Sequence, residues 1–245
     1  MIKFFIETYI NNLDENAERV MVDLKKINYL PELNRFKNLK ILWCHDNQLT
    51  SLPNLSFLEN LQELICCNNQ LTSLPNLNKN LKIFYCSNNQ FTSLPSLNEN
   101  LEELNCSNNK LTSLPNLNKN LEILNCRVNK LTSLPNLNEN LQILNCSNNQ
   151  LTCLPSLNQN LYALYYYYNP IYTIIDSDNL IIIRKKLKIL YIFRHLYYCL
   201  KFKSQFRHLL WKIREPKIMQ KYHPSYLDEF LKDENIDIDM VLDNW

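Results

Sequence analysis

Six consecutive segments of the chain repeat one order of apolar and polar positions. They share the template L-x-x-L-x-C-x-x-N-x-[LF]-T-x-L-P-x-L and begin at Leu39, Leu61, Leu81, Leu101, Leu121 and Leu141. The first segment is about 22 residues long and the others about 20, and a unit of this size cannot bury its apolar side chains alone. Such repeats must stack on one another, and the pattern therefore predicts a solenoid.

Within each repeat, the alternation L-x-C has the period of two that is typical of a strand, with leucine and cysteine pointing inward. The proline in the following L-P-x-L step disfavours a helix, so we expect an extended segment on the opposite side of each turn. The predicted fold class is an α/β repeat: a leucine-rich repeat solenoid with a parallel concave β-sheet and an extended convex side.

Asparagine recurs at the ninth position of the template. We expect it to turn inward and to hydrogen-bond backbone groups of neighbouring turns. These positions are Asn47, Asn69, Asn89, Asn109, Asn129, Asn149 and Asn169. Glycine is absent from the chain, which excludes P-loops, dinucleotide fingerprints and nucleophile elbows in their usual forms. Other asparagines should take the left-handed turn positions that glycine would otherwise fill.

Six of the nine cysteines recur at one template position, which indicates packing as small apolar side chains. They are Cys44, Cys66, Cys86, Cys106, Cys126 and Cys146. The cysteines form no C-x-x-C pairs and no histidines are interspersed at ligand spacing, so we expect no metal and no cofactor. Free thiols indicate a reducing compartment, and the sequence after Met1 lacks a signal-peptide pattern. These features predict an intracellular protein without a transmembrane segment.

The pattern divides the chain into three parts. Residues 1–38 are expected to form an N-terminal cap with a degenerate repeat, residues 39–175 the leucine-rich repeats, and residues 176–245 a small α-helical C-terminal module. In the module, mixed apolar and basic residues predict a helix over 180–214, and Ser225 followed by Asp228 indicates the start of a second helix. We expect the acidic tail beyond it to fold back on the basic helix.

The outward positions of the predicted strands form three columns on the concave face. Trp, Tyr and Arg, the residues that most often carry interface energy, gather there. We therefore expect a non-enzymatic protein–protein interaction module that binds a protein partner on this face. The candidate contacts are Trp43, His45, Ile65, Tyr85, Ile123, Arg127, Tyr165 and Tyr167. An alternative is that Trp43 and the tyrosine run only cover the open ends of the solenoid.

A second hypothesis places function on the basic helix. The formal net charge of the chain is only +2, yet residues 180–214 contain many basic residues and no acidic one. Such a helix can be an ordinary amphipathic element, or it can contact nucleic acid or an anionic membrane. The candidate contacts are Arg184, Lys185, Lys188, Arg194, Lys201 and Arg207. Because no Ser/His/Asp or Cys/His constellation can be placed by spacing, we expect no enzyme and no small-molecule substrate.

The L-P steps over residues 30–170 resemble the short, bacterial-type leucine-rich repeats of about 20 residues. Bacterial effectors of that type act as scaffolds or carry a C-terminal ubiquitin-ligase domain built around a C-x-D cysteine. Here Cys199 is followed by Leu200 and Lys201, so the resemblance leaves a ligase only as a distant alternative. The run from Trp211 to Met219 resembles the ends of repeat proteins from giant DNA viruses of the mimivirus group, which implies work in the cytoplasm of an infected host cell and a host protein as partner.

Overall fold

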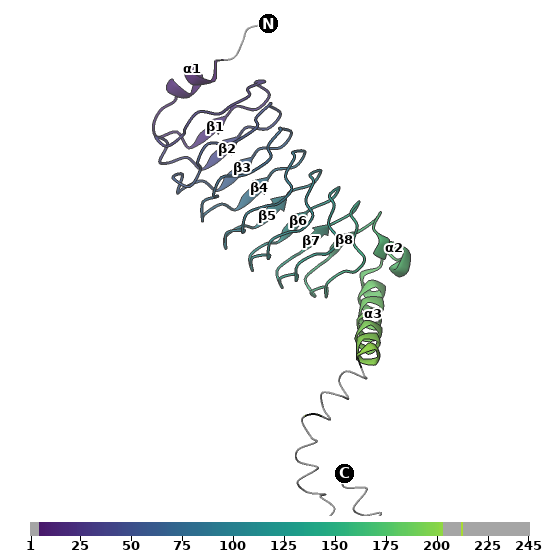
Figure 1. Ribbon diagram of the computed structural model, residues 1–245. Helices are drawn as coiled ribbons and strands as arrows, with labels where there is room; N and C mark the ends of the chain where they lie inside the picture. The colour runs from purple at the N-terminus through teal and green to yellow at the C-terminus, as the bar shows by residue number, and fades with distance from the viewer. Residues whose placement is uncertain (1–4, 203–211, 213–245) are drawn as a thin grey trace, which may run out of the picture. The chain divides into compact units, whose positions relative to one another are not determined.

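The structure, a computed structural model, describes residues 5–202 and residue 212 of the chain. Its main feature is an eight-stranded parallel sheet whose strands follow one another in chain order (Figure 1). The strands are β1 Arg19–Met21, β2 Ile41–Trp43, β3 Glu63–Ile65, β4 Ile83–Tyr85, β5 Glu103–Asn105, β6 Ile123–Asn125, β7 Ile143–Asn145 and β8 Ala163–Tyr165. The predicted solenoid with a parallel sheet is thus confirmed.

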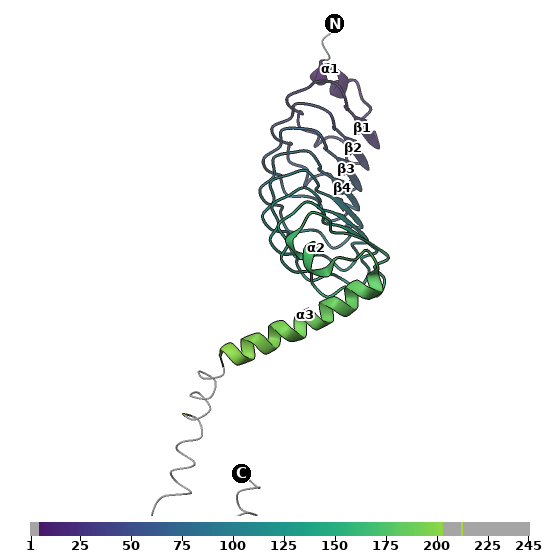
Figure 2. The same cartoon turned by 90° about the vertical axis from the view of Figure 1, so that its right-hand side faces the viewer.

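A single register joins neighbouring strands, because equivalent template positions pair with one another. Leu42 lies opposite Leu64, and Leu64 lies opposite Phe84. From β1 to β7 the middle side chain of each strand is buried and its two neighbours face outward. Figure 2 shows the first strands lined up along one side of the coil, with the rest of each turn along the other. The leucine core fills the space between these two sides.

The N-terminal part contains a strand that the repeat template does not reveal. Val20 of β1 pairs with Leu42 and is fully buried, as is Val22, whose amide donates to the carbonyl of Trp43 at 2.8 Å. Ahead of β1, helix α1 (Ile6–Asn11) buries Ile6 and Ile10. The strand was missed because valine replaces both the leucine and the cysteine of the template, and lysine replaces its inward asparagine.

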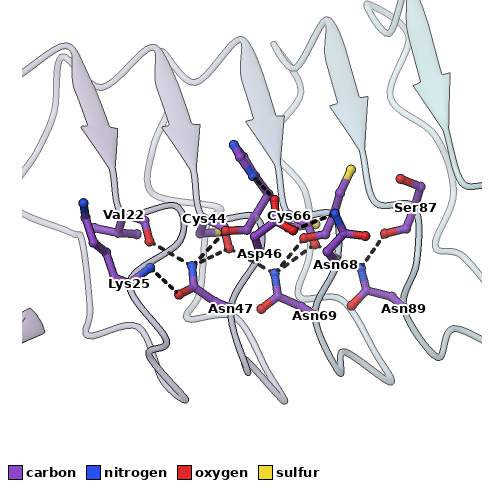
Figure 3. A network of polar contacts seen from close by, with 12 residues as sticks. Val22, Lys25, Cys44, Asp46, Asn47, Cys66, Asn68, Asn69, Ser87 and Asn89 are labelled. Carbon is purple, nitrogen blue, oxygen red and sulfur yellow. Dashed lines mark hydrogen bonds and ion pairs between the residues drawn. The ribbon is translucent and has the colours of Figure 1, made fainter. Parts of the chain in front are cut away.

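The template asparagines form a continuous ladder of hydrogen bonds inside the coil (Figure 3). The Asn47 amide nitrogen donates to the carbonyls of Val22 (2.8 Å) and Cys44 (3.1 Å), while its oxygen accepts from the amide of Ile27. The same arrangement recurs through Asn169, whose oxygen accepts from the amide of Leu151. Each side chain therefore joins its own turn to the preceding one, which confirms the predicted inward role.

The six template cysteines are fully buried free thiols, as the packing interpretation predicts. Burial raises the pKa of the Cys44, Cys106 and Cys146 thiols to about 12. A thiol with such a pKa stays protonated near neutral pH and is a poor nucleophile or metal ligand. The ladder of cysteines is thus part of the core.

The turn that follows each buried cysteine contains one residue with left-handed backbone. Asn68, Asn88, Asn108 and Asn148 take this conformation with φ between 51° and 56°. Asparagine tolerates it better than most residues, which supports the expectation that it replaces glycine in these turns. Val128, at φ 53°, departs from this choice.

Two helices follow the sheet, α2 Pro170–Ile175 and α3 Leu180–Lys201. The α2 helix was not predicted, whereas α3 begins where the sequence pattern placed a helix. The predicted continuation from 203 to 214, apart from Lys212, and the second helix from Ser225 lie outside the described residues. One compact unit extends to Lys188 and a second begins at Ile189; the three-part division from sequence stays a prediction. None of the described helices combines the length and apolar character that crossing a bilayer requires.

Candidate functional site

The outward side chains of β2 to β8 form one continuous surface, which we call the sheet face. It includes the residues on either side of each buried strand centre and the residue after each buried cysteine. The pairing register brings Trp43 beside Ile65 and Ile65 beside Tyr85. Four of the predicted contacts, these three and His45, therefore lie together on the first repeats. All four side chains are half-buried.

The aromatic side chains of Trp43 and Tyr85 each donate a hydrogen bond to a carboxylate of the next repeat. The Trp43 indole Nε1 donates to Glu63 Oε1 at 2.7 Å, and the Tyr85 hydroxyl donates to Glu103 Oε2. Burial, with a further contribution from the hydrogen bond to Glu103, raises the pKa of the Tyr85 hydroxyl to about 12. Sequence reasoning missed the roles of Glu63 and Glu103, although glutamate at this strand position occurs only in these two of the repeats.

Polar contacts also fix the edge of the sheet face beside Trp43. The His45 Nδ1 lies 2.6 Å from Asp46 Oδ2, and the ring centroids of Trp43 and His45 are 6.5 Å apart. Asn68 Nδ2 donates to Asp46 Oδ1 at 2.9 Å. Four residues from two repeats are thereby linked, and the imidazole has a defined neighbour on each side.

Farther along the chain, the sheet face changes in character. Ile123 is half-buried on β6, while Arg127 and Val128 are exposed in the turn that follows. The amide of Arg127 donates to Asn125 Oδ1 at 3.3 Å. Sequence reasoning singled out Arg127 but missed Val128, whose signal is the loss of asparagine at a left-handed position.

The tyrosines near the end of the sheet divide into two groups. Tyr166 replaces the template cysteine, is buried, and donates its hydroxyl to the carbonyl of Ser177 at 2.6 Å. Its ring contacts those of Tyr167 and Tyr172, with centroids 6.3 and 5.2 Å away. Tyr165 is exposed on the sheet face. The first group covers the end of the core, so Tyr167 has a packing role, whereas Tyr165 remains free to contact another molecule.

The candidate basic residues of α3 differ in their surroundings. The Arg184 Nη2 donates to the carbonyls of Asn158 (2.8 Å) and Leu161 (3.0 Å). These contacts repeat, one turn later, those of the Asn158 amide with the carbonyls of Asn138 and Leu141. The bonds of Asn158 belong to a second series of asparagine hydrogen bonds, and Arg184 continues this series. It thereby supplies donors to two carbonyls in the last turn of the solenoid.

The remaining predicted anion contacts are exposed on α3 or lie outside the described structure. Lys185, Lys188 and Arg194 have exposed side chains, and the side chain of Lys201 is not described. Arg207 lies outside the described residues.

No metal centre is evident in the described part of the chain. No cluster of three His, Cys, Asp or Glu residues there could hold a metal ion. The side chain of Cys199, the distant ligase candidate, is not described.

Comparisons with known proteins identify the repeats. The family model described as "Leucine Rich repeats (2 copies)" matches residues 37–79, 59–99 and 79–119. The leucine-rich effector protein YopM from Yersinia pestis has a similar structure, with 28% identity and a TM-score of 0.59 over 67% of this chain and 52% of that chain. The leucine-rich repeat domain of a Shigella effector gives 29% identity and 0.57 over 67% and 73%.

A third similar structure is described as having a cysteine ladder. The functional domain of InlJ from Listeria monocytogenes, which includes a cysteine ladder, has 29% identity and a TM-score of 0.50 over 64% of this chain and 40% of that one. No match was found among curated protein sequences. This chain spans about half the length of the YopM structure that it resembles.

The eight-stranded parallel sheet and the similar structures give this chain the fold of a leucine-rich repeat solenoid, and the family model matches residues 37–119 of it. The narrower resemblance to the short L-P class and to giant-virus proteins stays a prediction.

Proposed function

We propose that this chain is a non-enzymatic protein-binding module and that a protein partner lies against the sheet face. The observation that carries the proposal is the fixation of Trp43 and Tyr85 by carboxylates of the neighbouring repeats. Large aromatic side chains with fixed orientation lose little conformational entropy on binding, and they supply much of the energy of many interfaces.

The size of the sheet face suits such a partner. Seven strands spaced about 4.8 Å apart give the sheet face a length of about 29 Å. A standard protein–protein interface needs about 800 Å² from each partner, which a face of this length can provide. A broad, repeated surface of this kind suits a macromolecule better than a small ligand, which needs an enclosed pocket.

The polar chemistry of the face also favours a protein. The indole nitrogen, the tyrosine hydroxyl and Nδ1 of the imidazole have partners within the solenoid. A partner can therefore cover the rings of Trp43 and Tyr85 without leaving their polar atoms unpaired, which removes a common cost of burial.

Affinity capture from a cell lysate tests the proposal, with Trp43→Ala/Tyr85→Ala beside the wild type. The matched control is Phe57→Ala/Lys79→Ala, because these exposed residues lie outside the strands. We expect a protein that stays bound in high salt to the wild type and to the control, and that is lost from the sheet-face variant. Equal capture by all three proteins would refute the assignment of the sheet face. Circular dichroism checks that each variant keeps the fold.

A second candidate function rests on the exposed apolar side chains of α3. Ile181 and Ile182 are exposed among the described residues, close in the chain to exposed Lys185 and Lys188. Aliphatic groups beside lysines suit the headgroup region of an anionic membrane. Flotation with vesicles of phosphatidylcholine, with and without phosphatidylserine, tests this candidate. Binding that needs phosphatidylserine and is lost in Lys185→Gln/Lys188→Gln supports it, whereas displacement by added RNA would favour nucleic acid instead.

A further inference from the structure

One turn of the solenoid departs from its neighbours where packing gives no reason for the change. The repeats before and after it have Ser107-Asn108 and Ser147-Asn148 behind the buried cysteine, and both serines are buried. The turn after β6 has Arg127-Val128 instead, and both side chains are exposed. An exposed cation and an exposed branched apolar side chain therefore stand where the neighbouring turns have a buried serine and an asparagine.

The valine of this pair is in an unfavourable conformation. Val128 has φ 53°, in the left-handed region where a β-branched side chain clashes with its own backbone. The neighbouring turns place asparagine at this position, which tolerates the conformation. Since Val128 remains 38% exposed, the substitution also gains little burial. Strain of this kind, without a folding benefit, points to a role at the surface.

Two lysines add positive charge to the same edge. Lys110 and Lys130 occupy one template position in adjacent repeats, where Gln90 and Gln150 stand on either side. Both lysines are exposed, and the amide of Lys130 donates to the carbonyl of Leu111 in the preceding turn. Like charges on adjacent turns repel each other, so this arrangement also costs stability unless an anion lies nearby.

No carboxylate of the described residues neutralises this edge. The ion pairs among the described residues lie elsewhere and join Lys40 to Glu18, His45 to Asp46 and Lys82 to Glu102. Lys110 contacts only the neutral side chain of Gln90, at 3.3 Å. The guanidinium of Arg127 therefore keeps its donors for a bidentate contact with a carboxylate from outside.

From these observations we infer that Arg127, Val128, Lys110 and Lys130 form a subsite for an acidic segment of the protein partner. A partner carboxylate binds Arg127, an apolar side chain next to it packs on Val128, and the two lysines attract further acidic residues. The inference rests on the proposed function, because Arg127 belongs to the sheet face and the subsite states the chemistry of the partner that would bind there. It names that partner as a protein with an exposed, acidic and partly apolar segment.

The repeat pattern itself supplies the test variant. Arg127→Ser/Val128→Asn restores the pair found in both neighbouring turns, so the fold should be kept and any loss of binding reports the lost side chains. The probe is a displayed library of random 12-residue peptides selected on the immobilised full chain. We expect the selected peptides to be rich in Asp and Glu beside an apolar residue, and to bind the restored variant at least tenfold more weakly.

Further arms separate the inference from the function on which it rests. Replacing Asp and Glu by Asn and Gln in a selected peptide should weaken its binding to the wild type but change little with the restored variant. Peptides that lose binding to Trp43→Ala/Tyr85→Ala and keep it to the restored variant would overturn the acidic subsite and leave the sheet face as the binding surface. Selection without enrichment of acidic residues, or without any binder, would also overturn the inference.

Discussion

Replacing Asn89 by alanine tests the asparagine ladder, which joins successive turns of the solenoid. The Asn89 amide nitrogen donates to the carbonyls of Cys66 (2.9 Å), Cys86 (3.2 Å) and Ser87 (3.3 Å). Its oxygen accepts from the buried amide of Leu71 at 2.9 Å. One side chain thus serves four backbone groups in two turns.

The four groups do not suffer equally from the substitution. The Cys66 carbonyl keeps Asn69 Nδ2 as a donor, and the Cys86 carbonyl keeps Asn109 Nδ2. The amide of Leu71 has no second acceptor among its hydrogen bonds, so Asn89→Ala leaves a buried donor unpaired. An unpaired buried donor costs about 1–3 kcal/mol, and the weakened carbonyl bonds add to it. We expect the free energy of unfolding to fall by about 3 kcal/mol.

The control is Asn100→Ala, from the exposed side of the coil. Asn100 Nδ2 also donates to a backbone carbonyl, that of Lys79 at 2.9 Å, but water can replace this bond. Its loss should cost less than about 1 kcal/mol. Urea unfolding gives both free energies, and hydrogen exchange should show faster exchange of the Leu71 amide in Asn89→Ala alone. Equal costs for the two variants, or an unchanged Leu71 amide, would refute the reasoning.

Four further predictions follow from single side chains. Val128→Asn should stabilise the chain by about 1 kcal/mol in urea unfolding, because asparagine tolerates left-handed backbone. A loss of stability would show that the backbone of Val128 is not strained. In an ultraviolet titration, Glu103→Gln should lower the pKa of Tyr85 from about 12 but leave it above 10, since burial is the larger cause. An unchanged pKa would show that the Glu103 carboxylate does not contribute to the shift. Because burial raises the pKa of Cys106 from 9.0 to about 12, the unfolded thiol loses its proton first, and stability should fall as pH rises from 9 towards 12. Cys106→Ala should reduce this slope by about 1.4 kcal/mol per pH unit, and an unchanged slope would contradict the assignment. Arg184→Ala should speed hydrogen exchange around Leu161 while β2 keeps its protection, because two carbonyls of the last turn lose their donor; equal protection throughout would show that Arg184 does not seal that end.

The amino-acid sequence by itself determined the repeating part of this protein. Each turn contains its own leucines, cysteine and asparagine, and each makes the same contacts with the turns beside it, so the period alone was enough to predict strands, register and inward side chains. Even the left-handed turns followed from asparagine and the absence of glycine. Nearest-neighbour stacking makes such a fold readable from its local pattern.

Only the tertiary structure decided where that pattern fails. Strand β1 keeps the inward spacing with valines, which the template does not recognise but the growing sheet accepts. The bonds from Trp43 to Glu63 and from Tyr85 to Glu103 each join residues one turn apart, and they depend on side-chain directions that the sequence does not state. Arg184 closes the last turn because the chain returns there as a helix. These features depend on where chain segments and side chains lie in three dimensions, whereas the repeats follow from the period of the amino-acid sequence.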